Sequence, residues 1–304
     1  MLTPLALIAA ASAAIIVSAR MYGAARWRDK SDTLFASLNA AILPRPSTPY
    51  DAREIERLPR PVRRYLRSVL QDGQRVIDVV RLSQEGEFRQ SDTKDGWRAF
   101  TATQVVTTTP PGFVWDARIR TAPALSAFVH DAYVAGDGSL HAEALGLATV
   151  ADSRGTPAMA QGELLRYLAE AAWYPTALLP SQGVRWEAVD DSSANATLTD
   201  GATTVSLQFR FDSEGLIRSV SAASRYRGEI DGVPQFGRWE GSFSSYAVRH
   251  GLRIPLEAEV AWLSPEGAFP YCRLRLREID YDLALLPKPI VGGCYAGLLL
   301  STFR

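Results

Sequence analysis

Short runs of alternating apolar and polar residues, separated by tight-turn signals, constrain this sequence more than any other feature. In the run 203–211, apolar side chains occupy every second position from Val205 to Phe211 and polar ones lie between them. Asp-Gly pairs at 95–96, 137–138, 200–201 and 231–232 are typical of the two-residue turns that join antiparallel strands. A period of two with one buried face predicts an antiparallel meander in a mainly β protein.

Runs of this kind fill most of the chain and predict a curved antiparallel sheet of about 11–12 strands. No Gly-rich loop joins a strand to a helix in a nucleotide-binding pattern, and no period of 20–50 residues indicates a repeat fold. The predicted strands are 76–89, 97–109, 113–121, 128–135, 139–150, 184–189, 194–199, 203–211, 216–227, 237–248, 252–263 and 268–280.

One helix is expected to interrupt these strands. It follows Thr156-Pro157, covers residues 158–174 and ends before Pro175. One stripe of this helix is apolar, and a second stripe at helical spacing carries charged and aromatic side chains. With so many strands and one central helix, we predict that the sheet wraps around the helix or is covered by it.

The first 19 residues, Met1 to Ala19, contain no charged side chain. As a helix, residues 2–19 would be roughly 27 Å long, close to the hydrocarbon thickness of a bilayer. A cleaved signal peptide normally begins with a basic residue, which is absent here, so we expect a retained transmembrane anchor, with cleavage as the alternative. Arg20, Arg26 and Arg28 follow, and the positive-inside rule then places the rest of the chain in the cytoplasm, at the inner membrane. A periplasmic or extracellular domain is the alternative.

We divide the chain into an anchor (1–20), a juxtamembrane segment and linker (21–56), a single β-rich domain (57–285) and a C-terminal tail (286–304). A short helix over residues 62–70 carries Arg63, Arg64 and Arg67 on one side. Basic residues are attracted to anionic leaflets, so this helix is expected near the bilayer surface.

Composition limits the kinds of partner that this chain is expected to bind. The formal net charge is zero, which disfavours nucleic acid as a partner. The expected partners are the membrane, through residues 2–19, and a lipid or another hydrophobic small molecule. Two cysteines, Cys272 and Cys294, are too few for a disulfide framework, and the sequence leaves their pairing and the oligomeric state open.

Three stretches together resemble a known family. They are Leu58 to Leu66, Trp97 to Trp115 with Gln104, and Gly162 to Thr176. The pattern spans roughly residues 55–285 and is similar to a bacterial membrane-associated domain family of unknown function, whose members often carry N-terminal membrane segments. The resemblance implies no activity and no catalytic residue. The expected architecture also resembles the lipoprotein-carrier (LolA-like) fold, a curved sheet with a helix against its concave face.

Motifs for catalysis or metal binding are weak. His130-Asp131 and the pair His141 and Glu143 lie on neighbouring predicted strands, but no CxxC or HExxH motif supplies further zinc ligands. No G-x-S-x-G turn for a nucleophilic serine occurs. We therefore assign no catalytic residue, no metal ligand and no cofactor.

The charged stripe of the helix at 158–174 is the stronger candidate for a site. Arg166 lies three residues after Glu163 and four before Glu170, so both carboxylates can reach one guanidinium. On an exposed helix this is ordinary salt bridging, whereas inside a sheet the charges need paired partners or a ligand. The expected ligand-binding residues are Glu163, Arg166, Tyr167, Glu170, Trp173, Trp97 and Trp115.

Three functions remain open at this point, and binding is favoured over catalysis. The first is a membrane-anchored module that binds a hydrophobic ligand or lipid between the sheet and the helix at 158–174, in an apolar cavity of several hundred Å3. The second is a hydrolase-like enzyme in which Glu163 or Glu170 meets His130 or His141 in one cleft. The third is a protein-interaction scaffold at the membrane surface, with a large exposed apolar patch.

Overall fold

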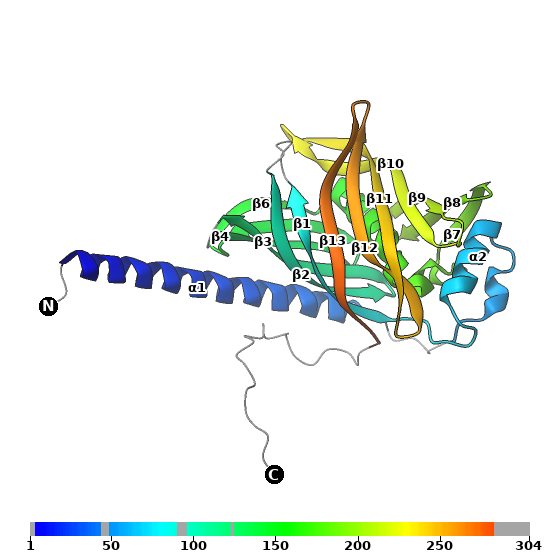
Figure 1. Ribbon diagram of the computed structural model, residues 1–304, viewed down its shortest axis with the longest axis horizontal. Coiled ribbons are helices and arrows are strands. Elements are labelled where there is room, and N and C mark those ends of the chain that lie inside the picture. The colour runs from blue at the N-terminus through cyan, green and yellow to red at the C-terminus, as the bar shows by residue number, and fades with distance from the viewer. Residues whose placement is uncertain (1–3, 44–48, 90–95, 123–124, 283–304) are drawn as a thin grey trace, which may run out of the picture.

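The described part of the chain is built on one antiparallel sheet of 13 strands, drawn in Figure 1. The computed structural model describes residues 4–43, 49–89, 96–122 and 125–282, and side chains from residue 10 onward. The strand order is β6-β5-β4-β3-β2-β1-β13-β12-β11-β10-β9-β8-β7. Consecutive strands pair with each other except β6 and β7, which form the two edges of the sheet. The first and last strands, β1 and β13, also pair and join the two meanders into one sheet.

The strands are β1 (Val79–Arg89), β2 (Trp97–Thr108), β3 (Pro111–Ala122), β4 (Leu125–Val134), β5 (Asp137–Ala144), β6 (Ala148–Arg154), β7 (Arg185–Asp190), β8 (Ser193–Asp200), β9 (Thr203–Phe211), β10 (Ile217–Ile230), β11 (Val233–Arg249), β12 (Leu252–Ser264) and β13 (Gly267–Tyr281). The α-helices are α1 (Pro4–Ala40), α2 (Arg60–Val69) and α3 (Pro157–Glu170). Short 3-10 helices are η1 (Ala52–Ile55), η2 (Ala171–Trp173), η3 (Pro175–Leu178) and η4 (Pro180–Gln182).

The predicted mainly β, antiparallel fold is confirmed, with one strand more than expected. The run 139–150 is not one strand, because Leu145 and Gly146 adopt left-handed backbone angles, with φ of 55° and 72°, and turn the chain between β5 and β6. Residues 144–148 are all apolar or glycine, without a polar turn pair such as Asp-Gly, so the sequence pattern did not reveal the break.

Helix α3 lies on one face of the sheet, which we call the inner face. It begins at Thr156, whose side chain accepts a hydrogen bond from the backbone N–H of Met159, and it packs against β3, β4 and β5 on one side and β9 and β10 on the other. Leu164, Leu165 and Leu168 are 0–2% exposed, and each contributes about 1.5–3 kcal/mol by leaving water. The helix therefore bridges the two halves of the sheet from inside.

Helix α1 is one continuous helix from Pro4 to Ala40, so no element boundary separates the expected anchor from the segment after it. Its C-terminal part packs on the opposite face of the sheet, the outer face, against β3 and β4, and its N-terminal part projects beyond the sheet (Figure 1). Among helices whose side chains are described, none is long and apolar enough to cross a membrane. Side chains 1–9 of the expected anchor lie outside the described residues.

Helix α2 does not lie beside the projecting part of α1 (Figure 1), and its expected place near the bilayer surface stays a prediction. It sits at the end of the domain opposite the projecting part of α1 (Figure 1). Its position is fixed by Val62, Tyr65 and Leu66, which are fully buried, and by packing against β8 and β12. Packing of its apolar side against the sheet, which the sequence pattern could not orient, decides where its arginines point.

Candidate functional site

A group of charged side chains lies between α3 and the inner face, and we call it the inner polar cluster (Gln104, Asp131, Glu163, Arg166 and Glu170). Arg166 is at its centre: Nε donates to Oε1 of Glu170 at 2.7 Å, and Nη1 donates to Oδ2 of Asp131. The other carboxylate oxygen of Glu170 accepts a hydrogen bond from Nε2 of Gln104 at 2.6 Å. The side chains of Arg166, Asp131 and Glu170 are only 12–15% exposed, so most of their charge is removed from water and must be balanced within the cluster.

Aromatic rings support the arginine from the strands. The guanidinium of Arg166 lies 5.0 Å from the ring centroids of Phe113 and Trp115 on β3. Trp115 is held by a hydrogen bond of 2.9 Å from its Nε1 to Oε1 of Gln84, and its ring meets that of Phe100 edge to face. Cation–π contacts of this kind are strongest where water is excluded, so the strands both fix the position of Arg166 and stabilise its charge.

Glu163 completes the charge balance of the cluster. Burial, and then the neighbouring Asp131 carboxylate, raise the pKa of Glu163 well above its ordinary value. Oε2 of Glu163 and Oδ1 of Asp131 are both buried, and neither has a hydrogen-bond partner in the described part of the chain. A proton held on Glu163 satisfies this pair. The cluster then carries one cation, Arg166, and two anions, Asp131 and Glu170, and a second buried arginine, Arg225, restores neutrality.

Aromatic side chains from the central strands continue the inner face past the cluster, and we call them the aromatic wall (Phe88, Trp239, Trp262 and Tyr271). The rings of Trp262 and Tyr271 stack with centroids 5.7 Å apart, and Phe88 meets Tyr271 edge to face at 6.0 Å. The hydroxyl of Tyr271 accepts a hydrogen bond of 2.9 Å from Nε1 of Trp239. Phe88, Trp262 and Tyr271 are only partly buried although they belong to the core face, so the wall retains accessible apolar surface.

Arg225 on β10 connects the cluster to the wall. Its guanidinium lies 4.7 Å from the ring centroid of Trp239, and Nη1 donates to the hydroxyl of Tyr271 at 3.4 Å. The residue is 8% exposed, and its Nε has no hydrogen-bond partner in the described part of the chain. A buried N–H of a charged group without an acceptor is costly, so Arg225 is an unsatisfied polar group between the cluster and the wall.

The structure brings together four of the seven residues expected at a ligand site: Glu163, Arg166, Glu170 and Trp115. Tyr167 is buried with its ring against Tyr174. Trp173 is 1% exposed, and its Nε1 donates to the carbonyl of Pro255 at 3.0 Å. Both serve the packing of α3 and η2.

Trp97 lies on the face of β2 opposite to Phe100, with the guanidiniums of Arg89 and Arg273 5.2 and 4.7 Å from its ring centroid. It therefore does not belong to the inner face. Sequence reasoning missed Arg225 and Tyr271. The only available signal was an arginine or a tyrosine within an alternating run, and most such residues face solvent.

His130 and His141 lie on the outer face, in a row that crosses four strands. Asp116, His130, His141 and Asp152 pair in register from β3 to β6. Trp27 of α1 covers the row: its ring stacks 4.0 Å from that of His130 and 5.8 Å from that of His141, and Nε1 donates to Asp116 at 3.0 Å. The row therefore forms the surface on which α1 is seated.

Further polar contacts fix α1 on this row. Oγ of Ser31 lies 2.8 Å from Nε2 of His130 and donates to Oδ2 of Asp116 at 2.8 Å. Nζ of Lys30 donates to Oε1 of the buried Glu143 at 2.6 Å. Burial lowers the pKa of His130 to about 4, against the opposing effect of Asp116. His130 is thus neutral at physiological pH, as a buried structural histidine should be.

The sheet separates these histidines from the carboxylates of α3. His130 and Asp131 are consecutive on β4 and point to opposite faces, His130 toward Trp27 and Asp131 toward Arg166. The single cleft required by the hydrolase-like alternative is therefore not formed by Glu163 or Glu170 with His130 or His141. Within the described residues, no three His, Cys, Asp or Glu side chains are grouped to hold a metal ion.

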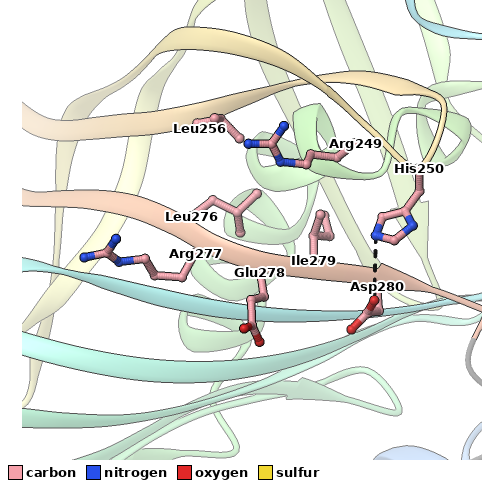
Figure 2. Close-up of a pocket in the computed structure, with 8 residues that line it drawn as sticks. All are labelled: Arg249, His250, Leu256, Leu276, Arg277, Glu278, Ile279 and Asp280. Atoms are coloured by element: carbon pink, nitrogen blue, oxygen red, sulfur yellow. Dashed lines mark ion pairs between the residues drawn. The ribbon is translucent and has the colours of Figure 1, made fainter. Parts of the chain in front are cut away.

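A hollow of about 260 Å3 opens where β12 and β13 separate, beyond the pair Glu257 and Arg275. Figure 2 shows His250 facing Asp280 across its mouth, at 3.7 Å. On the inner side, Trp173 contacts both strands. Its carbonyl accepts a hydrogen bond from the hydroxyl of Tyr281 on β13, and its Nε1 donates to the carbonyl of Pro255 on β12. No residue of α3 lines this hollow, so it is not the cavity expected between the sheet and the helix at 158–174. Its lining residues are Arg249, His250, Leu256, Leu276, Arg277, Glu278, Ile279 and Asp280.

Comparison with known proteins places the chain in a family. Residues 56–281 match the model of a family of unknown function (DUF6920), and the chain belongs to that family. No curated protein matches it in sequence. Among solved structures, it is similar to a LolA superfamily protein from Nitrosomonas europaea, with 11% identity over 69% of this chain and 88% of that chain and a TM-score of 0.39. It is also similar to a beta-barrel-like protein of a domain of unknown function (DUF1849) from Brucella abortus, with 8% identity over 68% and 98% of the two chains and a TM-score of 0.27.

Proposed function

We propose that this member of a family of unknown function binds an amphiphilic molecule on the inner face of its sheet and is tethered to a membrane by α1. The observation that carries the proposal is the aromatic wall, which lies directly beside a buried arginine with an unused N–H. The wall offers apolar surface to a hydrocarbon chain, and Arg225 offers a donor to the polar end of the same molecule. Such a combination of apolar lining and few polar groups is typical of ligand sites.

The wall suits an alkyl chain because its rings are rigid and partly open to solvent. Phe88, Trp262 and Tyr271 are held by ring contacts with one another, so a ligand loses little free energy in ordering them. Each methylene that leaves water on these rings contributes about 0.8 kcal/mol. The proposed site is not the expected cavity between α3 and the sheet. The leucines of α3 pack directly against the strands, so we place the ligand on the surface beside the helix.

The polar end of the ligand should carry a hydrogen-bond acceptor. Arg225 donates to Tyr271 through Nη1, and its Nε, which has no acceptor among the described residues, is the proposed donor to a carboxylate, ester or phosphate oxygen. The neighbouring cluster has no unpaired cation to compete, because Arg166 is shared by Asp131 and Glu170. The polar head of the amphiphile is therefore expected at Arg225 and its chain along Trp262 and Tyr271.

The tether rests on the projecting part of α1. Ile15, Ile16 and Val17 are 70%, 59% and 55% exposed, and the described residues before Arg20 carry no charge. A helix that is apolar on all sides normally lies in a membrane or a protein core. Burial of these residues in a bilayer removes this exposed surface from water, and the basic residues that follow Ala19 within α1 favour a cytoplasmic domain.

Photo-crosslinking tests the binding proposal with the full chain in nanodiscs of phosphatidylcholine. The probe is palmitic acid that carries a diazirine on its chain, and labelled peptides are identified by mass spectrometry. We expect the strongest labelling in β12 and β13, around Trp262 and Tyr271. Arg225→Met should reduce this labelling at least five-fold, because the carboxylate of the probe loses its donor.

Trp262→Glu and Trp97→Glu form a matched pair for the same experiment. Both replace a strand tryptophan by a charge, but Trp262 is on the inner face and Trp97 on the outer face. Labelling should fall in the first variant and persist in the second. Labelling spread evenly over both faces, or equal loss in the two variants, would contradict binding at the aromatic wall.

A further inference from the structure

The end of the domain from which α1 departs has an unusual surface. Gly23 of α1 touches the β5–β6 turn so closely that an added Cβ would lie 2.0 Å from the carbonyl oxygen of Leu145. The backbone N–H of Leu145 donates to the carbonyl of Ser126 at 2.9 Å, which brings the start of β4 to the same place. We call this surface the exit surface; it is made of the β5–β6 turn, the strand ends at Ala122 and Leu125, and residues 20–23 of α1.

The exit surface is apolar at its edge and basic around it. Leu125 and Val150 are 46% and 62% exposed there. Arg118 and Arg120 on the outer face of β3 are exposed beside them, since Arg120 pairs with Ser126 across the β3–β4 ladder. Neither arginine has a carboxylate partner among the described residues; Arg118 has only the ring of Phe128, 5.1 Å away.

Helix geometry fixes how far this surface lies from the proposed tether. Gly23 follows Ala19 by four residues, which is about 6 Å along a continuous helix. The headgroup layer on one side of a bilayer is of similar thickness, roughly 5–8 Å. Since α1 has no break and is clamped to the outer face by Trp27, Lys30 and Ser31, the domain cannot swing away from this position without losing those contacts.

We propose that the exit surface is the membrane-contacting face of the domain and seats on anionic lipid headgroups. This rests on the proposed tether. Arg118 and Arg120 meet lipid phosphates, while Leu125 and Val150 enter the boundary between headgroups and acyl chains. Charge complementarity selects this occupant, because unpaired arginines next to exposed apolar side chains match an anionic leaflet, where each basic residue contributes about 1 kcal/mol. The arginines of α2, at the other end of the domain, do not take part.

The two edge strands of the sheet offer a matched pair of reporter sites. Val150 on β6 and Val189 on β7 are both exposed valines, at the exit surface and on the opposite edge strand respectively. Full chains with Val150→Cys or Val189→Cys, each with Cys272→Ala and Cys294→Ser, are labelled with nitrobenzoxadiazole, whose emission rises in an apolar environment. They are reconstituted in nanodiscs of phosphatidylcholine alone or with 30% phosphatidylglycerol.

We expect at least a three-fold higher emission from the label at position 150 with phosphatidylglycerol than without it, and no difference at position 189. The increase should disappear in 0.5 M NaCl, because screening weakens contacts of the arginines with phosphate. Arg118→Glu with Arg120→Glu should abolish it, and Arg63→Glu with Arg64→Glu on α2 should leave it unchanged.

Flotation after an alkaline carbonate wash separates the two proposals. If the full chain does not remain with the lipid, the tether is refuted, and the inference fails with it. If the chain remains with the lipid but the label at position 150 responds no more than the label at 189, the tether stands and the exit surface is refuted. The inference would also be overturned if Arg63→Glu with Arg64→Glu abolished the response while Arg118→Glu with Arg120→Glu left it unchanged.

Discussion

Replacement of Arg166 by methionine tests the electrostatics of the inner polar cluster. Arg166→Met keeps the length and apolar volume of the side chain but removes the cation that, among the described residues, pairs with both Asp131 and Glu170. Both carboxylates are 85% or more removed from solvent, so they cannot recover their hydration. The folded protein must then hold two buried charges without a partner or bind protons to neutralise them.

The expected loss of stability at pH 7.5 is about 4 kcal/mol, because removal of one partner of a buried ion pair costs about 3–5 kcal/mol. For a domain of this size the melting temperature should fall by roughly 8–16 °C. The loss should shrink as the pH falls. Carboxylates that have lost their cationic partner are costly to bury only while they are charged, so protons bound at lower pH reduce the loss relative to wild type.

Urea denaturation of the full chain in detergent micelles, followed by far-ultraviolet circular dichroism at pH 7.5 and 5.0, measures both quantities. Arg277→Met is the matched control, since this arginine pairs with Glu85 on the exposed outer face and should contribute less than about 1 kcal/mol. Glu163→Gln should also cost less than about 1 kcal/mol, because a protonated Glu163 and a glutamine are both neutral donors. A loss below 1 kcal/mol for Arg166→Met, or a loss of several kcal/mol that is the same at both pH values, would refute the reasoning.

Three further predictions concern the seat of α1. Trp27→Ala should reduce the free energy of unfolding in urea by about 3–5 kcal/mol, because the side chain is 1% exposed and stacked on His130; a loss below 1 kcal/mol would mean that α1 is not docked. Gly146→Ala should lower the melting temperature more than Gly136→Ala. Both have positive φ, but only at Gly146 would the new Cβ meet the backbone of α1, at 2.3 Å from the carbonyl oxygen of Gly23. Stability should fall between pH 6.5 and 4, because the unfolded chain protonates His130 while its folded pKa is about 4. His130→Gln should flatten this slope, and an unchanged slope in unfolding measurements would contradict the assignment.

Local regularities of the chain could be predicted from the sequence, and relations between distant segments could not. Period-two alternation and Asp-Gly turns locate most strands within a few residues, and Thr156-Pro157 locates the start of α3. The break at Leu145 was missed, because a leucine in a left-handed conformation is imposed by the close contact of the turn with α1. Contacts between residues that are far apart in the sequence cannot be recognised from the pattern of neighbouring residues.

In the candidate site, too, contacts within one helix could be predicted from the sequence, and contacts between the helix and the strands could not. The spacing of Glu163, Arg166 and Glu170 predicted one guanidinium between two carboxylates, and Arg166 does pair with Glu170. Its other partner is Asp131, from β4, and Glu163 instead faces Asp131 as a protonated neighbour. Which strand supplies the second carboxylate depends on how α3 crosses the sheet, and sequence spacing along one helix carries no information about that.

Alternation, turn residues and helical spacing act over a few neighbouring residues, so they are enough to specify an antiparallel sheet with one helix against it. The face that each residue serves depends instead on contacts between distant segments. His130 and Asp131 are adjacent in the chain, yet one seats α1 and the other holds Arg166 on the far side of the sheet. Successive residues of a strand point to opposite faces, and the packing of α1 and α3 alone settles which face is which.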